Sequence, residues 1–270
     1  MALGAGTAAP ATAEAAPPHP WTYDAPGWGW QLETYPEDES TRTVWYTSPH
    51  GTFTVPGGWT QMSQWHRLHG GGRGVLGYPV SSTSSEQLTD VVDVGIFQRF
   101  ERGILYSSDG GAHATRYADA LTQVHRSLGG GRGSLGYPTS DVNTQAAGFR
   151  YQTFRHGVAY SSPVGTFGVW GALNQRHRSH GGGTGLGYPT SHRVQESRTH
   201  YYQVFERGVV YCFALTRDQD GCSVVTEPFR TMHAARGGGS GDLGYPIHEA
   251  RFSDGRLVQT FEGGTLVATP

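Results

Sequence analysis

The stretch GGGRGVLGYP, from Gly70 to Pro79, organises this chain because it occurs four times. It returns as GGGRGSLGYP, GGGTGLGYP and GGGSGDLGYP, which end at Pro138, Pro189 and Pro246. The copies lie roughly 50 to 60 residues apart, a period that is typical of repeat architectures. The 270 residues are therefore expected to form an array of duplicated units.

A short helix is expected immediately before each copy, because apolar residues there recur at helical spacing. The four segments are 57–68, 116–128, 169–179 and 227–236. A glycine run is a usual C-terminal stop for a helix, and the dipole favours the histidine or arginine found in each last turn. One histidine holds the same place in every unit, as His66, His125, His177 and His233.

An aromatic strand follows each copy, at 97–108, 151–162, 202–213 and 258–269. Residue types alternate along it with the period of two that marks a β-strand, and a glycine near its middle suits a tight hairpin. A glutamine holds one position in all four strands. Because an unpaired buried amide is costly, we expect these side chains to form buried hydrogen bonds between neighbouring units. They are Gln98, Gln152, Gln203 and Gln259.

The strand with a repeated tyrosine occurs once more than the helix does. Residues 43–55 align with 157–169, so the chain is expected to enter in mid-unit, after a worn glycine and Leu-Gly-Tyr-Pro element at 21–40. A ring of blades closes when strands from the N-terminus and strands from the C-terminus together form its last blade, and the extra strands at the N-terminus and the incomplete unit at the C-terminus fit this arrangement. We therefore predict an all-β protein with short helices, a β-propeller of five blades (four is the alternative), in one domain over 21–270.

Composition limits the classes of protein to which the chain can belong. Glycine, at 41 of 270 residues, is about twice its usual share and favours many turns. The formal charge of −2 leaves no electrostatic footprint for nucleic acid or an anionic membrane. No apolar run approaches the roughly 20 residues of a membrane-spanning helix. Residues 1–20, rich in Ala, Pro and Thr, are predicted to be a disordered tail, and no cofactor is expected.

The two cysteines, Cys212 and Cys222, bracket a short loop. A disulfide that closes so short a loop suits a secreted protein, whereas the alternative is a pair of reduced thiols in a cytosolic one. The first residues lack the basic segment and apolar core of a signal peptide, and they look like the mature start of an exported protein. We predict the disulfide and an extracellular location.

The units resemble LGFP repeats, with tyrosine in place of that family's phenylalanine, over about residues 40 to 270. The resemblance rests on the helix end, the glycine run, Leu-Gly-aromatic-Pro and the Gly-x-x-Tyr strand, which recur in fixed order. It implies a secreted actinobacterial protein, a small β-propeller and a role in holding cell-surface or cell-wall glycan. The units are also similar to the lectin subunits of secreted Streptomyces toxin particles, which implies a lectin carried on a larger secreted protein.

A propeller lectin binds sugar between its blades, so its binding residues should recur once per unit. Sugars are held by aromatic faces and by side-chain hydrogen bonds, and two repeated sets offer these groups. Packing within the protein is the alternative role for both sets. The predicted ligand-binding residues are His66, His125, His177 and His233, with Tyr46, Tyr106, Tyr160 and Tyr211. The tyrosine within Leu-Gly-Tyr-Pro is expected in the core, because phenylalanine serves the family there.

Paired histidines raise the question of a metal site. His66 with His69, and His177 with His180, could place two imidazoles on one helical face. The other two units lack the second histidine, so we predict surface histidines and no metal.

Two further classes of protein remain as alternatives to a lectin. An arabinan-cleaving glycoside hydrolase needs two carboxylates that flank the scissile bond. The carboxylate that recurs here, Glu101, Glu206 and Glu262, is expected to be structural, so we predict no enzymatic activity. A protein-docking subunit without sugar binding is the other alternative, because the segment 81–95 and the loop between the cysteines depart from the repeat.

Overall fold

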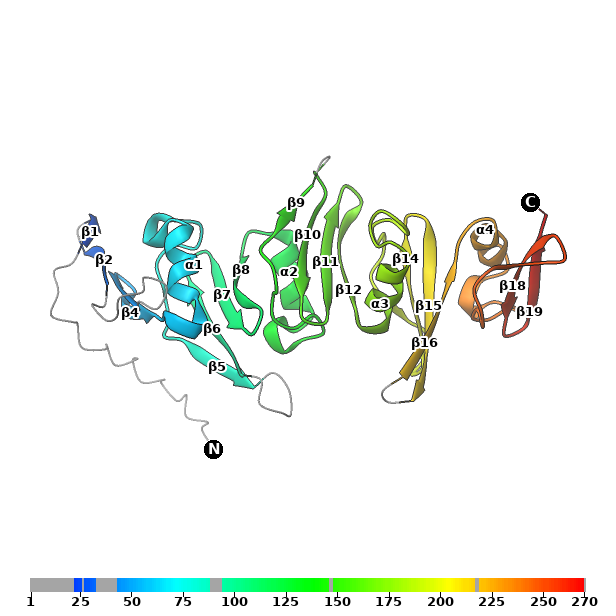
Figure 1. Ribbon diagram of the computed structural model, residues 1–270, viewed down its shortest axis with the longest axis horizontal. Helices are drawn as coiled ribbons and strands as arrows, with labels where there is room; N and C mark the ends of the chain where they lie inside the picture. Colours follow the sequence, from blue (N-terminus) through cyan, green and yellow to red (C-terminus); the bar gives the residue numbers. More distant parts are fainter. Residues whose placement is uncertain are drawn as a thin grey trace, which may run out of the picture. The chain divides into compact units, whose positions relative to one another are not determined.

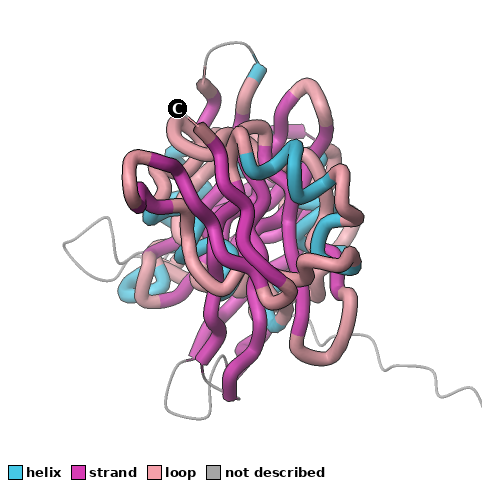
Figure 2. Tube along the Cα trace, turned by 90° about the vertical axis from the view of Figure 1, so that its right-hand side faces the viewer, coloured by secondary structure: helices cyan, strands magenta, loops and turns pink. Residues whose placement is uncertain are grey.

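The computed structural model describes residues 22–25, 27–32, 43–87, 94–145, 148–216 and 219–269. They form five antiparallel sheets joined through short helices. Strands make up more of the trace than helices do (Figure 2). The mostly-β class with short helices is therefore confirmed. The helices are α1 (Met62–Leu68), α2 (Ala120–Ser127), α3 (Gly171–Ser179) and α4 (Phe229–Ala234), within the expected segments. The predicted tail, 1–20, lies outside the described residues.

The chain divides into two compact units, residues 1–117 and 118–270, and each is described by itself. The first unit holds two four-stranded sheets and α1 (Figure 1). Consecutive strands are neighbours, so each sheet is a meander. The first sheet contains β1 (Thr22–Ala25), β2 (Trp28–Leu32), β3 (Val44–Ser48) and β4 (Gly51–Val55), and the second contains β5 (Ser84–Gln87), β6 (Val94–Phe100), β7 (Gly103–Ser108) and β8 (Gly111–Arg116).

The second unit holds three sheets of the same kind, with α2, α3 and α4 (Figure 1). Two sheets have four strands and the last has three. The strands are β9 (Asn143–Thr144), β10 (Arg150–Phe154), β11 (Gly157–Ser162) and β12 (Gly165–Trp170), then β13 (Val194–Gln195), β14 (His200–Phe205), β15 (Gly208–Thr216) and β16 (Gln219–Val225), and finally β17 (Arg251–Ser253), β18 (Arg256–Phe261) and β19 (Gly264–Ala268).

No closed propeller ring is found among the described residues, and the number of blades is not confirmed. The first sheet consists of β1–β4 and the last of β17–β19, so no described sheet pairs strands from both ends of the chain. The reason lies in the segment interpreted as a worn Leu-Gly-Tyr-Pro element. It contains β1 and β2, and β2 pairs with β3. The first sheet is therefore built from strands that are consecutive in the sequence.

The glycine run makes the turn that ends each helix. Its first glycine is left-handed in every copy, with φ of +92° at Gly70 and +80° at Gly181, a conformation that glycine adopts without strain. Its last glycine is needed for a different reason. A Cβ added at Gly185 would lie 1.7 Å from the carbonyl oxygen of His180, so the turn has no room for a side chain there.

The Leu-Gly-Tyr-Pro segment packs beneath the strand that follows it. Its leucine is buried in all four copies, and its proline forms an isolated β-bridge with the phenylalanine of that strand. Its tyrosine is buried as expected in three copies, Tyr78, Tyr137 and Tyr245. Tyr188 differs, because it is only half-buried.

In three of the repeats, the repeated glutamine joins its sheet to the one before it. Gln203 on β14 donates from Nε2 to the carbonyl of Gly168 on β12 at 3.1 Å and to that of Ser191 at 3.0 Å. Gln259 donates in the same way to β16 and to the loop before its own sheet, and Gln98 makes the equivalent bonds in the first unit. The predicted hydrogen bonds between neighbouring repeats are therefore confirmed for these three.

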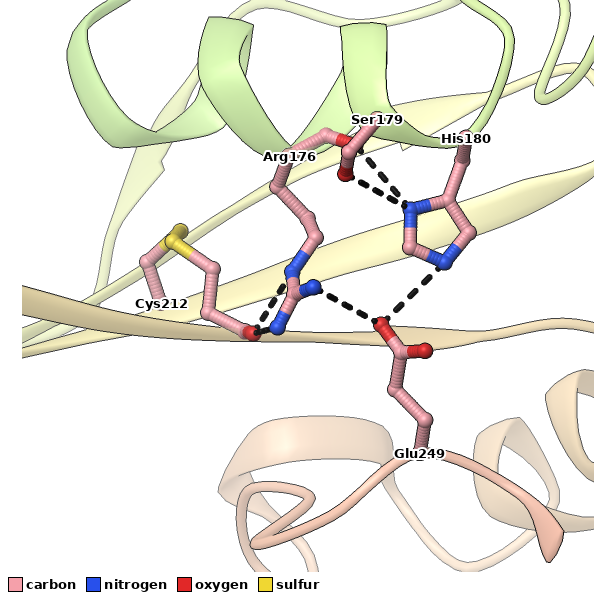
Figure 3. Close-up of a disulfide and its surroundings, with 6 residues drawn as sticks. Arg176, Ser179, His180, Cys212 and Glu249 are labelled. Carbon is pink, nitrogen blue, oxygen red and sulfur yellow. Dashed lines mark hydrogen bonds and ion pairs between the residues drawn. A yellow bond between two sulfur atoms is a disulfide. The ribbon is translucent and has the colours of Figure 1, made fainter.

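A disulfide joins β15 to β16. Cys212 and Cys222 face each other in the strand register and are bonded, as predicted. The Cys222 carbonyl also accepts a hydrogen bond from Nε of Arg176 on α3 at 2.8 Å (Figure 3). Arg176 and His180 both contact the carboxylate of Glu249, at 3.3 and 3.1 Å. These contacts hold α3 to the next sheet and to the loop that precedes β17.

Candidate functional site

The four repeated histidines lie inside the protein. Each is at most 1% exposed, and each Nε2 lies 2.8 or 2.9 Å from the carbonyl oxygen of the glycine in the next Leu-Gly-Tyr-Pro. Each ring also packs on the phenylalanine of the following strand. The histidines thus fasten each helix to the segment after it. Ligand contact by His66, His125, His177 and His233 stays a prediction.

Burial keeps these imidazoles neutral. Loss of contact with water lowers the pKa of all four, and it lowers the pKa of His66 to about 4. A carbonyl oxygen only accepts hydrogen bonds, so the proton of the neutral ring lies on Nε2 and leaves Nδ1 as an acceptor. In the first unit the Tyr46 hydroxyl donates to Nδ1 of His66, at 2.9 Å.

The repeated tyrosines of the third strand in each sheet are largely buried. Tyr46, Tyr106, Tyr160 and Tyr211 are 2%, 4%, 8% and 6% exposed. Tyr160 and Tyr46 each line a cleft. Burial and the neighbouring Tyr188 raise the pKa of Tyr160 to about 12, so its hydroxyl keeps its proton at neutral pH. Ligand contact by these tyrosines also stays a prediction.

A cleft of about 670 Å³ lies between the β9–β12 sheet and the segment from α3 to the third Leu-Gly-Tyr-Pro. We call it the β9–β12 cleft. Its aromatic wall is well ordered by mutual contacts: Phe149 stacks on Tyr188 with ring centroids 4.3 Å apart, and Tyr188 meets Tyr160 edge-on at 5.6 Å. The Tyr188 hydroxyl donates to Oε1 of Gln145 at 3.1 Å. The cleft therefore presents fixed, flat apolar faces with polar edges.

The polar wall of the β9–β12 cleft comes from α3 and from the turn after β10. Arg178 is exposed, and its guanidinium has no hydrogen-bond or ion-pair partner in the described part of the chain. Arg155 enters from the turn. Asn174 is 8% exposed, and its Oδ1 has no partner among the described residues. A buried polar atom left unpaired costs about 1–3 kcal/mol, so a ligand that supplies a donor to this amide would gain binding energy.

The first unit contains a smaller cleft, of about 300 Å³, that is built in the same way. We call it the β1–β4 cleft. In both, two aromatic residues face each other across the second and third strands, an arginine directly follows the repeated histidine, and the glycine run forms the rim. The matching residues are Trp30, Tyr46, Arg67 and Gly70–Gly72 in this cleft, and Tyr151, Tyr160, Arg178, Gly181 and Gly183 in the other.

The corresponding face of the β13–β16 sheet carries a carboxylate. Tyr211 again meets the tyrosine of the next Leu-Gly-Tyr-Pro, Tyr245, with centroids 5.0 Å apart. Glu196 occupies the sequence position of Gln145 and accepts a hydrogen bond from Ser240 at 2.8 Å. Burial raises the pKa of Tyr245, and the nearby Glu196 carboxylate raises it further. The repeated cleft thus has chemically different versions within one chain.

Two of the other sequence-based expectations concern carboxylates and metals. Glu101, Glu206 and Glu262 each accept a hydrogen bond from the backbone N–H of the tyrosine in Leu-Gly-Tyr-Pro, which is an internal structural role. No group of three or more metal-ligating side chains occurs among the residues that the structure describes.

Much of the β9–β12 cleft was missed by reasoning from the sequence. Phe149, Tyr151 and Asn174 do not belong to sets that repeat without change. Arg178 does carry a signal, because an arginine follows the repeated histidine in three of the four units, and Tyr188 was expected in the core. These residues come together only when α3 and the following glycine turn fold over the sheet.

The fold and the clefts define a tandem repeat protein whose unit is a small antiparallel sheet, a short helix and a glycine turn. Residues 135–185 match the family model of the LGFP repeat. The match begins at Leu135 of one Leu-Gly-Tyr-Pro and ends at Gly185, directly before the next. The chain therefore carries the LGFP repeat, a repeat of extracellular and cell-surface proteins.

No curated protein matches the chain. Two solved structures from B. thetaiotaomicron show a distant similarity: the extracellular domains of a one-component system and of a hybrid two-component system, at 12% and 13% identity. The alignments cover 86% of this chain but 26% and 27% of those chains, with a TM-score of 0.17 in both cases. The chain thus spans about a quarter of their length.

Among the described residues, the helices are all too short or too polar to cross a membrane.

Proposed function

We propose that this chain is a secreted carbohydrate-binding module without catalytic activity, and that its β9–β12 and β1–β4 clefts hold cell-surface or cell-wall glycan. The observation that carries the proposal is repetition. Two clefts in different units combine facing aromatic rings with an arginine at equivalent positions. A junction that served stability alone would be close-packed like the rest of a protein interior.

The chemistry of the β9–β12 cleft suits a sugar. The rings of Phe149, Tyr151 and Tyr188 offer faces for the C–H surface of a pyranose or furanose. The amides of Gln145 and Asn174 offer hydrogen bonds to hydroxyl groups. The volume of about 670 Å³ lies within the range of small-ligand sites.

Binding is favoured over hydrolysis by the charge of the clefts. Glycoside hydrolysis uses two carboxyl groups that flank the scissile bond. Among the described residues that line either cleft there is no aspartate or glutamate. Several weak sites on one chain gain affinity through multivalency, which suits a module that targets a larger secreted protein to a glycan surface. Carriage on such a protein, as in the toxin particles, is part of the proposal.

The test is a glycan array probed with the full chain, followed by calorimetric titration of any retained sugar. We expect Tyr188→Ala to weaken binding at least about tenfold, because it removes one face of the aromatic wall. Phe252→Ala is the matched control, since Phe252 is 72% exposed and does not line either cleft. Retention of no sugar, or an equal loss in both variants, would refute the proposal.

A further inference from the structure

We infer that the β9–β12 cleft selects an acidic saccharide, a glycan whose sugar units carry a carboxylate as uronic acids do. The inference rests on the proposed function and names the class of sugar. It is carried by the charges that line the cleft, by an unpaired buried amide, and by a comparison with the equivalent face of the next repeat.

The side chains that line the cleft include arginines but no carboxylate among the described residues. The arginines are Arg155 and Arg178. The Arg178 guanidinium is exposed and has no hydrogen-bond or ion-pair partner in the ranges that the structure describes. It is therefore available to an anion that enters from solution.

The groups in the cleft match a uronate better than a neutral sugar or a simple anion. A guanidinium presents a planar fork of N–H donors that pairs with a carboxylate through two parallel hydrogen bonds. The aromatic wall adds a surface for the sugar ring, which a small inorganic anion would not use. The buried amide of Asn174, whose Oδ1 lacks a partner, needs a donor such as a sugar hydroxyl. One ligand that carries a ring, hydroxyls and a carboxylate satisfies all three.

The next repeat supplies an internal comparison, because the charge at the equivalent positions is reversed. Its face keeps the aromatic residues, with Tyr211 against Tyr245. The positions of Gln145, Arg155 and Arg178 are occupied by Glu196, Glu206 and Ala234, and that of Asn174 by Arg230. Over these four positions, the β9–β12 cleft has two arginines, whereas the next repeat has two glutamates and one arginine. The aromatic frame is common to the repeats, whereas the charge is specific to each cleft.

The lining of the β1–β4 cleft is similar to that of the β9–β12 cleft. It is lined by Arg67 and Arg73, and again no carboxylate is among its described lining residues.

The experiment is a calorimetric titration of the full chain with an oligogalacturonate and with the same oligosaccharide as its methyl ester, which keeps the ring and removes the charge. We expect the acid to bind at least about tenfold more tightly than the ester, and this ratio to fall as salt is raised. Arg178→Ala, which installs the alanine of the next repeat, should reduce the ratio at the β9–β12 cleft. Gln145→Glu should act in the same direction. Arg198→Ala is the matched control, because Arg198 is exposed and lies outside both clefts.

The outcomes separate this inference from the proposed function. Equal binding of the acid and the ester would overturn the acidic selection and leave the glycan-binding proposal intact. A ratio lowered as much by Arg198→Ala as by Arg178→Ala would also overturn it, because general attraction to the chain would explain the result. Failure of both oligosaccharides to bind, while the array retains a neutral sugar, would refute the inference alone. Failure of every sugar would refute both.

Discussion

Acid is expected to destabilise the first unit through a single buried side chain, His66. The side chain is 1% exposed, and its burial lowers its pKa from 6.5 to about 4. The unfolded chain therefore binds more protons than the folded chain between these two values. The contribution of His66 to the free energy of unfolding is largest above pH 6.5, falls as the pH drops through this window, and levels off below about pH 4.

The size of the effect follows from the two pKa values. At pH 5 the unfolded histidine is almost fully protonated, while the folded one is mostly neutral. The linkage relation then gives a loss of about 2 kcal/mol in the free energy of unfolding between pH 7 and pH 5. His125, His177 and His233 have pKa values lowered by burial as well, so the second unit changes stability with the same sign.

The measurement is urea unfolding at a series of pH values, followed by tryptophan fluorescence. All but one of the 7 tryptophans precede residue 118, so the signal reports mainly on the first unit. His66→Gln removes the titration, while its amide can still donate to the Gly77 carbonyl that His66 contacts at 2.9 Å. We expect this variant to have a lower free energy of unfolding than wild type at pH 7. Between pH 7 and pH 5, its free energy of unfolding should fall by about 2 kcal/mol less than that of wild type.

The control is His192→Gln, because His192 is exposed and lies in the second unit, on which the tryptophan signal reports little. It should leave the pH dependence close to that of wild type. Parallel curves for wild type and His66→Gln would refute the reasoning, since the buried neutral imidazole would then not be the group that acid protonates on unfolding.

Two further predictions concern the second unit. Gln203→Leu leaves the Gly168 and Ser191 carbonyls without their donor, so it should lower the free energy of unfolding by about 1–3 kcal/mol, measured by circular dichroism. The same change at the exposed Gln175 should have little effect. Equal losses in the two variants would contradict the role assigned to Gln203. Reduction of the Cys212–Cys222 disulfide should lower the free energy of unfolding of the second unit by about 3 kcal/mol. It should leave the unfolding transition of the first unit, detected by tryptophan fluorescence, unchanged. An equal shift of both transitions would contradict this prediction.

The sequence by itself determined the repeated unit, because its signals are local. Helix ends need glycines with left-handed backbone or no room for a Cβ, and strands need alternating side chains, so both leave a pattern in consecutive residues. The four helices, the mostly-β class and the glutamine hydrogen bonds followed from that pattern, and the disulfide followed from the short spacing of the two cysteines. Equivalent side chains in each copy predicted a common internal role, which the strand glutamines have.

Only the tertiary structure decided which strands complete the first sheet and where the clefts lie. The pattern of 21–40 is that of a degenerate repeat element, but its residues 22–25 and 28–32 form two strands of the first sheet, and the second of them pairs with β3. Tyr188 and Tyr245 share the same local sequence, yet Tyr188 is half-buried beside a cleft and Tyr245 is buried near Glu196. Exposure and charge at such a site depend on side chains brought together from a strand, a helix and a turn that are distant in sequence, and a local pattern does not contain that information.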